Sequence, residues 1–194
     1  MGSRDLIDGK AMKEVQVASL GLDKSSNTPV VILRETEGQR VLPIWIGPNE
    51  ASAIAMELAG IKFSRPLTHD LFNTVVTGLG SELVRVVITK VVDNTYYASL
   101  IYKHDGELIS IDSRPSDSVA LALRAAAPIF ADDELLDTAG LDMDPAGLET
   151  ELTDPGWSSD TAGAEESGET ERTHERLRDY LKGLNPEDFG RFNP

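Results

Sequence analysis

The sequence predicts an α+β fold, in which antiparallel strand meanders alternate with Ala- and Leu-rich helices. Three observations support this class. Residues 14–46 and 83–112 each hold three strand-like segments separated by turn residues. Each region then runs through a proline, Pro48 or Pro115, into an amphipathic helical segment. Because the second unit repeats the order of the first, the sequence suggests an internal duplication, although two ordinary strand-to-helix connections would give the same pattern.

Short connections join the predicted strands. The first strand alternates polar and apolar residues, which is typical of a strand with one buried face. Clusters of Gly, Ser, Asn and Asp separate the segments and favour tight turns, so neighbouring strands are expected to pair antiparallel. The expected strands span 14–22, 29–34, 40–46, 83–92, 95–102 and 107–112.

The helices are expected to begin at proline or at small polar residues. Pro48 fits the first position of a helix, where its missing N–H has no intrahelical partner, and Gly60 is expected to end that helix. Thr68 is the expected N-cap of a second helix, which has an apolar face. A third helix and a short capped helical turn are expected at 115–126 and 132–136.

The charge of the chain is unevenly distributed. The net charge is −15, but residues 131–170 hold thirteen acidic residues and no lysine or arginine, so they account for −13 of it. A segment this acidic and this poor in apolar residues cannot offset its ordering entropy, and we expect a disordered linker. The front part is nearly neutral and could approach nucleic acid, whereas the linker would repel it. The expected organisation is a leader at 1–11, one domain at 12–137, the acidic linker at 138–170 and a C-terminal helical tail at 171–194.

Several classes of protein are excluded by what the sequence lacks. There is no cysteine, which excludes disulfide bonds and thiolate chemistry. No run of about 18 apolar residues is present, and the N-terminus lacks the apolar core of a signal peptide, so a cytoplasmic protein without membrane partners is expected. The phosphate-binding glycine loop, the paired-histidine zinc motif and the Gly-x-Ser-x-Gly elbow are also missing.

Polar and charged side chains gather at the starts of the three predicted helices. Helix N-termini attract anions, and Arg65 and Arg114 are placed there to bind phosphate oxygens, with the hydroxyl of Ser116 beside them. Carboxylates in the same clusters offer the oxygen ligands that Mg²⁺ or Mn²⁺ prefers. Such an ion would activate water and stabilise the leaving oxygen of a phosphodiester. The candidate carboxylates are Glu50, Asp70, Asp112 and Asp117.

Each of these residues also has a purely structural interpretation. Acidic residues in the first turn of a helix often act as caps or as partners of the helix dipole, and Thr68 and Ser116 are good N-caps. His69 fits a hydrogen-bonded structural histidine as well as a catalytic base. Arg65 and Arg114 each precede a proline, and they could hold loops in place by pairing with carboxylates.

Three motifs stand out at these positions. They are Leu42-Pro43-Ile44-Trp45-Ile46-Gly47 followed by Glu50, Arg65-Pro66-Leu67-Thr68-His69-Asp70-Leu71, and Asp112-Ser113-Arg114-Pro115-Ser116-Asp117 running on to Arg124. In order and spacing they resemble the bifunctional nuclease family, and the resemblance covers roughly residues 12–137. Residues 186–190 are similar to the C-terminal extension of some bacterial members. The resemblance implies a compact, internally duplicated α+β domain that hydrolyses phosphodiester bonds in both DNA and RNA.

The resemblance also implies roles for the polar residues of the motifs. It makes His69 the candidate base, and it makes Arg65 and Arg114 the candidate phosphate clamps, with Ser116 as a further substrate contact. The candidate metal ligands are Glu50, Asp112 and Asp117. The candidate catalytic residues are Glu50, His69, Asp70 and Asp117.

Two hypotheses for the function remain open. The first is a nuclease assisted by Mg²⁺ or Mn²⁺, which predicts that the three helix starts converge in one cleft. The second is a non-enzymatic regulatory module whose helix starts bind an anionic ligand or a partner, which predicts that the acidic residues are engaged in caps and ion pairs. Either protein could form a homo-oligomer through Trp45, the strand edges and the tail helix.

Overall fold

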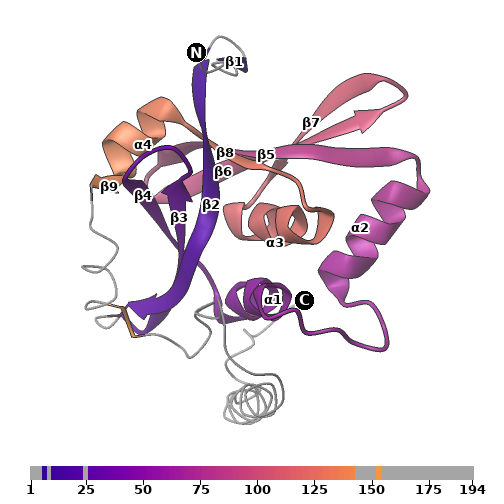
Figure 1. The fold of residues 1–194 in the computed structure, drawn as a ribbon, viewed down its shortest axis with the longest axis horizontal. Helices are drawn as coiled ribbons and strands as arrows, with labels where there is room; N and C mark the ends of the chain where they lie inside the picture. Colours follow the sequence, from indigo (N-terminus) through magenta and orange to yellow (C-terminus); the bar gives the residue numbers. More distant parts are fainter. Residues whose placement is uncertain (1–5, 8–9, 24–25, 143–151, 154–194) are drawn as a thin grey trace.

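A twisted sheet and four helices make up the part of the chain that the structure, a computed structural model, describes: residues 6–7, 10–23, 26–142 and 152–153 (Figure 1). The first unit consists of β2 (Lys10–Asp23), β3 (Thr28–Glu35), β4 (Arg40–Trp45), α1 (Pro48–Leu58) and α2 (Thr68–Gly78). The second consists of β5 (Ser81–Val92), β6 (Thr95–His104), β7 (Glu107–Ser113), α3 (Pro115–Ala125), β8 (Ile129–Asp132) and α4 (Asp133–Ala139). Three strands of two residues each are β1 (Leu6–Ile7), β9 (Leu141–Asp142) and β10 (Leu152–Thr153). The α+β class is confirmed, and each unit is a three-stranded meander followed by a helix.

One short strand joins the two meanders into a single sheet. The main path through the sheet is β7-β6-β5-β8-β2-β3-β4-β9. β8 pairs antiparallel with β2 on one side and parallel with β5 on the other. Because β8 follows both meanders in the sequence, the connection from β7 to β8 has to cross the sheet, and α3 forms this crossover.

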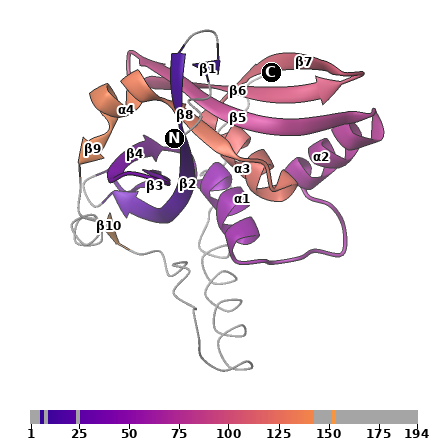
Figure 2. The same cartoon turned by 45° about the horizontal axis from the view of Figure 1, so that its top comes forward.

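Three helices lie together beside the sheet, with α3 in contact with both α1 and α2 (Figure 2). Apolar side chains from β3, β4 and these helices meet in the core, and the best-packed of them have no exposed surface. Examples are Val31, Leu33, Leu42, Ile54 and Val119. None of the helices in the described part of the chain is long and apolar enough to cross a bilayer.

The helix starts follow the predicted design with two changes. Pro48 and Pro115 are the first residues of α1 and α3, and each helix has an acidic residue in its first turn. The predicted N-cap Thr68 is wrong by one position, because Leu67 is the N-cap and its backbone N–H donates to the Asp70 carboxylate at 2.9 Å. Ser116 is not an N-cap either, because Arg114 holds that position.

The predicted domain boundaries are too narrow. β2 begins at Lys10 and β1 pairs with it, so part of the expected leader at 1–11 belongs to the sheet. At the other end α4 runs to Ala139, and two short strands follow it, so the sheet and its helices extend beyond residue 137 into the expected linker. The remainder of the linker and the helical tail at 171–194 lie outside the described residues.

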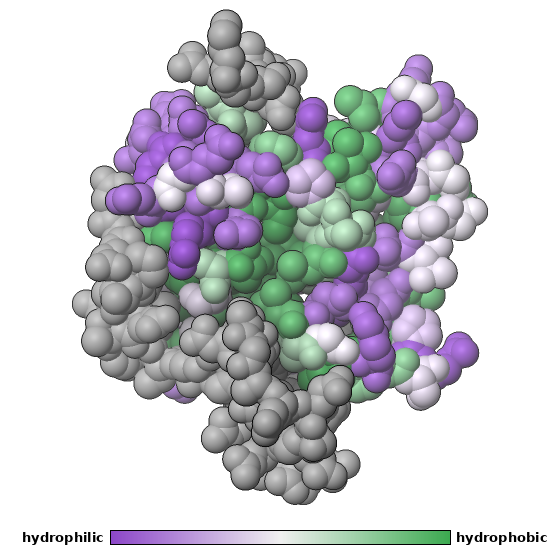
Figure 3. All heavy atoms as spheres, viewed as in Figure 1, coloured by the Kyte–Doolittle hydropathy of each residue, from purple (hydrophilic) through white to green (hydrophobic). Residues whose placement is uncertain are grey.

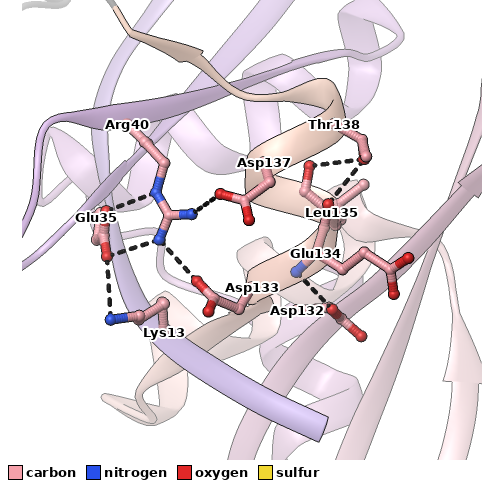
Figure 4. Close-up of polar contacts among 9 residues, drawn as sticks. All are labelled: Lys13, Glu35, Arg40, Asp132, Asp133, Glu134, Leu135, Asp137 and Thr138. Atoms are coloured by element: carbon pink, nitrogen blue, oxygen red, sulfur yellow. Dashed lines mark hydrogen bonds and ion pairs between the residues drawn. The ribbon is translucent and has the colours of Figure 1, made fainter.

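Arg40 binds α4 to the β3–β4 hairpin through three carboxylates (Figure 4). Its Nε and Nη2 each donate to Glu35 at 3.0 Å, and Nη2 also donates to Asp133 at 2.8 Å. Nη1 donates to Asp137. The Glu35 side chain is only 7% exposed, so its charge is compensated almost entirely by Arg40 and by Lys13, 3.7 Å away. The hydrogen bonds from Arg40 hold the pKa of Glu35 below its usual range, although burial opposes them.

Replacing Arg40 with glutamine is therefore expected to lower the free energy of unfolding by about 2 kcal/mol at pH 7. A carboxylate whose pKa is lowered in the folded state stabilises the protein above its unfolded pKa, and this contribution disappears as pH falls through the folded pKa. The difference between wild type and Arg40→Gln should thus be full at neutral pH and shrink below pH about 4.5. Urea unfolding across this pH range measures it. Lys62→Gln, which breaks a pair whose lysine is 77% exposed, should change stability by less than about 0.5 kcal/mol, and an equal loss in both variants would contradict the prediction.

Candidate functional site

The starts of α1 and α3 meet at one guanidinium group. Arg114, the N-cap of α3, donates from Nη1 to Glu50 Oε1 of α1 at 2.8 Å. It also donates from Nε and Nη2 to the two carboxylate oxygens of Asp117, at 2.6 and 3.1 Å. The fork geometry of arginine suits such two-point contacts with a carboxylate. Glu50 and Asp117 occupy equivalent first-turn positions in the two repeated units, so the repeat itself places two acidic residues around one cation.

The second helix adds a histidine to this group. His69, in the first turn of α2, places Nε2 3.2 Å from Asp117 Oδ1. Its side chain is 19% exposed, whereas that of Arg114 is 65% exposed. The group made by Glu50, His69, Arg114 and Asp117, which we call the Arg114 cluster, therefore reaches solvent mainly through the guanidinium. The starts of α1, α2 and α3 therefore meet at the Arg114 cluster.

The charges of the Arg114 cluster stabilise one another. Burial raises the pKa of Asp117, but the hydrogen bonds from Arg114 and His69 outweigh it and leave that pKa below its usual range. The hydrogen bond to Asp117 in turn raises the pKa of Arg114. Asp117 is thus an anion at neutral pH and Arg114 is a cation. Gly47 leaves space for the Glu50 side chain, because a Cβ at position 47 would lie 2.3 Å from Oε2 of Glu50.

Asp70 belongs to a different set of contacts. One of its carboxylate oxygens accepts from the backbone of Leu67, and the other accepts from Nε of Arg124 at 2.6 Å. Arg124 also donates to the backbone oxygens of Ala53 in α1 and Ala120 in α3, at 3.1 and 2.9 Å. The Arg124 side chain is 6% exposed. Asp70 and Arg124 therefore hold α1, α2 and α3 together, beside the Arg114 cluster rather than within it.

Three other predicted site residues stand apart from the cluster. Arg65 lies in the exposed connection between α1 and α2, and within the described residues its side chain has no hydrogen bond or ion pair. Asp112 is exposed on β7 and has no polar contact with Glu50 or Asp117. Ser116 is 6% exposed in the first turn of α3, so the structure does not present its hydroxyl to a substrate.

Of the three predicted metal ligands, Glu50 and Asp117 meet at Arg114, but Asp112 does not join them. Within the described ranges, no three His, Asp or Glu side chains are placed to share an ion. Arg114 already engages Glu50 and both carboxylate oxygens of Asp117, and Asp112 is not part of the group. A cation on these carboxylates would have to displace the guanidinium, so the residues as arranged do not fit a Mg²⁺ or Mn²⁺ site.

Sequence comparisons place the chain among known proteins. The profile of the bifunctional nuclease domain matches residues 31–144, which include the starts of α1, α2 and α3. The chain belongs to the bifunctional nuclease domain family. It is 39% identical to an uncharacterized protein of Mycobacterium tuberculosis over 92% of this chain and 98% of that protein.

Two plant members of the bifunctional nuclease domain family are more distant. Bifunctional nuclease 2 of Oryza sativa is 27% identical over 73% of this chain and 46% of the plant protein. Bifunctional nuclease 1 of Arabidopsis thaliana is 27% identical over 61% of this chain and 38% of its own length. This family member therefore spans less than half of either plant protein.

Arg124 is the residue near the site whose role sequence reasoning missed. It stood at the end of the third motif without an assigned partner. Residues seven apart lie on one face of a helix, so Arg124 could have been placed two turns after Asp117 on the same face. Its partners on α1 and α2 depend on how the helices pack, and no local pattern contains that information.

Proposed function

We propose that this protein hydrolyses phosphodiester bonds in DNA and RNA at the Arg114 cluster. The observation that supports this most directly is the convergence of a histidine–carboxylate pair with an exposed arginine at the starts of three helices. A paired histidine can accept a proton, and an exposed guanidinium can bind a phosphate. Membership of the bifunctional nuclease domain family supports nuclease chemistry at the level of the family.

In the proposed reaction, His69 is the general base. When Nε2 donates to Asp117, Nδ1 is the basic nitrogen and can accept a proton from an attacking water. The negative charge of Asp117 fixes this orientation and stabilises the imidazolium that forms. The water oxygen then bonds to phosphorus as the P–O bond to the leaving oxygen breaks, and the leaving oxygen takes a proton from solvent.

Arg114 is the proposed phosphate clamp. A guanidinium has five N–H donors, and three of them are used by Glu50 and Asp117. The other two are left for nonbridging phosphate oxygens, and they stabilise the charge that develops there. Glu50 then acts by holding Arg114 in place. Arg65 is exposed and lies four residues before His69 in the sequence. We propose that it is a second contact to the nucleic-acid backbone.

One observation favours the second candidate function, an anion-binding regulatory module. Glu50, Asp70 and Asp117 are all engaged by arginines in the structure. The regulatory hypothesis predicted that the acidic residues would be occupied by caps and ion pairs. In this version the two spare donors of Arg114 bind an anionic ligand, and no bond is cleaved. We propose in addition that two copies of the chain associate, which is compatible with either function.

Cleavage of fluorescent single-stranded RNA and DNA by purified protein distinguishes the two functions. Wild type is expected to cut both, and His69→Gln to cut at least about 100-fold more slowly. Glu82→Gln, which changes an exposed acid on β5, serves as the control and should keep full activity. Parallel reactions with Mg²⁺, Mn²⁺ or EDTA test the metal assistance that the sequence led us to expect, whereas the mechanism through His69 predicts cleavage that survives EDTA.

Other outcomes of the same experiment would overturn the nuclease proposal. Equal cleavage by wild type and His69→Gln would mean that the activity comes from another site or from a contaminant. Binding without cleavage under all conditions would support the regulatory module. Cleavage that requires Mg²⁺ or Mn²⁺ would keep the nuclease function and reject the metal-free mechanism.

A further inference from the structure

Most of the apolar side of helix α2 is turned away from the rest of the molecule, although Val76 packs against the core. Leu71, Phe72, Val75 and Leu79 are 52%, 44%, 49% and 69% exposed, and no residue of α2 is buried. Leu71 and Val75 of α2 and Leu79, its C-cap, are spaced four apart, so they form one stripe along the helix. Polar contacts fix the opposite side, where His69 pairs with Asp117 of α3. The helix therefore exposes the side that an amphipathic helix ordinarily buries.

A second apolar surface lies on β7, the strand at one edge of the sheet. Leu108, Ile109 and Ile111 are 60%, 43% and 43% exposed. Ile109 and Ile111 pair with Tyr102 and Leu100 of β6, whose side chains are in the core, so they lie on the core side of the sheet. α2 and β7 are at the same end of the molecule in Figures 1 and 2, and apolar surface is visible along β7 in Figure 3.

The backbone of β7 is open to a further strand. The β6–β7 turn has two residues, Asp105 and Gly106, both with positive φ, as in a type I′ hairpin. His104 and Glu107 then form the hydrogen-bonded pair that closes the turn, and such pairs alternate along an antiparallel ladder. Consequently residues 108, 110 and 112 point their N–H and C=O groups outward. Proline, lysine and β-bulges usually protect an exposed edge strand from pairing with another chain, and β7 has none of them.

We propose that α2 and β7 form the interface of a symmetric homodimer, in which β7 pairs antiparallel with β7 of a second copy about a two-fold axis at Ser110. This identifies the surface for the self-association proposed above. In this register Leu108 lies opposite Asp112, and Ile109 lies opposite Ile111, so no two acidic side chains face each other. A two-fold axis perpendicular to the sheet keeps both helix layers on one side of it, where the apolar side chains of the two copies meet.

The size of the exposed apolar surface agrees with a dimer. Leu108 points to the other face of the sheet. The other six apolar side chains named on α2 and β7 expose roughly 500 Å² in total, which lies in the range of the largest patch on a monomer. A standard interface buries about 800 Å² on each partner. The backbone of β7 and the polar residues around the patch would supply the rest of the buried area that a standard interface needs. A second copy is favoured over an unrelated partner because the same patch is complementary to itself in this register.

Sedimentation of the full chain and a single engineered cysteine test the proposal. Wild type is expected to sediment with twice its chain mass of 21.0 kDa. Leu79→Lys with Ile109→Lys is expected to sediment as a monomer with little change in melting temperature, because both side chains are exposed in the single chain and belong to the apolar surface that the dimer would cover. The chain has no cysteine, so Ser110→Cys places one thiol at the axis. Opposed residues of a hydrogen-bonded pair have Cα atoms about 5.5 Å apart, which a disulfide can span.

Mild oxidation, or a short bis-maleimide, should therefore convert Ser110→Cys into a covalent dimer. The control Glu37→Cys, in the exposed β3–β4 turn, should stay monomeric on a denaturing gel. A wild-type monomer at about 100 μM would overturn both the dimer and the surface. A wild-type dimer that Leu79→Lys with Ile109→Lys leaves intact, and that Ser110→Cys fails to cross-link, would keep self-association and reject this surface. A monomer in which α2 is protected from hydrogen exchange would mean that another segment of the chain covers it.

Discussion

Replacing Asp117 with asparagine is expected to slow phosphodiester hydrolysis about 1,000-fold. Asp117 accepts from His69 at 3.2 Å and from Arg114 at 2.6 and 3.1 Å, so it fixes both the proposed base and the proposed phosphate clamp. An asparagine of the same size has no negative charge to stabilise the imidazolium. Its amide also presents a donor where one of the two partners needs an acceptor, so the histidine loses its preferred tautomer.

The fold is expected to tolerate this change. The Asp117 side chain is 31% exposed, so the loss in stability should be near 1 kcal/mol. Single-turnover cleavage measured beside thermal unfolding separates the two effects. Asp112→Asn is the matched control, because Asp112 is an exposed acid nearby in sequence with no polar contact to the cluster, and it should keep wild-type activity. A large fall in melting temperature with cleavage unchanged would restore Asp117 to a purely structural role.

Replacing Arg124 with methionine is expected to cause the largest loss of stability, about 2–3 kcal/mol. The Arg124 side chain is 6% exposed and donates to Asp70, Ala53 and Ala120. Methionine fills a similar volume, but it leaves the Asp70 carboxylate and the Ala53 oxygen without this donor. The loss is smaller than for a fully buried pair, because Asp70 is 35% exposed and water can replace part of the interaction.

Arg114→Met provides the comparison on the same helix. Arg114 is 65% exposed but pairs with Glu50 and Asp117, so its removal should lower the free energy of unfolding by no more than about 1 kcal/mol and abolish the proposed activity. Arg124→Met should shift the midpoint strongly, and the activity of the protein that remains folded should fall only as far as the helix starts move apart. Arg114 would then act in the proposed site, and Arg124 would act by holding the three helices together. Equal stability losses in both variants would contradict this division.

The sequence predicted the strands and the helix starts because their signals are local. Alternation of polar and apolar residues fixes which residues of a strand face the core, and Pro48 and Pro115 fit only the first turn of a helix. Glu50 and His69 were found for the same reason, as polar residues at the first turn of a helix. Thr68 was misplaced because a cap preference does not say which neighbouring residue has its N–H satisfied; Asp70 decided this by accepting from Leu67.

By itself the sequence determined the α+β class and the set of polar residues at the helix starts, and it suggested the two repeated units. The tertiary structure alone decided which of them meet. Arg114 reaches Glu50 across 64 residues and His69 reaches Asp117 across 48, whereas Asp70 is drawn to Arg124 instead. These pairings depend on the crossover that places α3 between α1 and α2. Local patterns specify the period and the ends of each element, but contacts between distant elements follow from how their apolar faces pack.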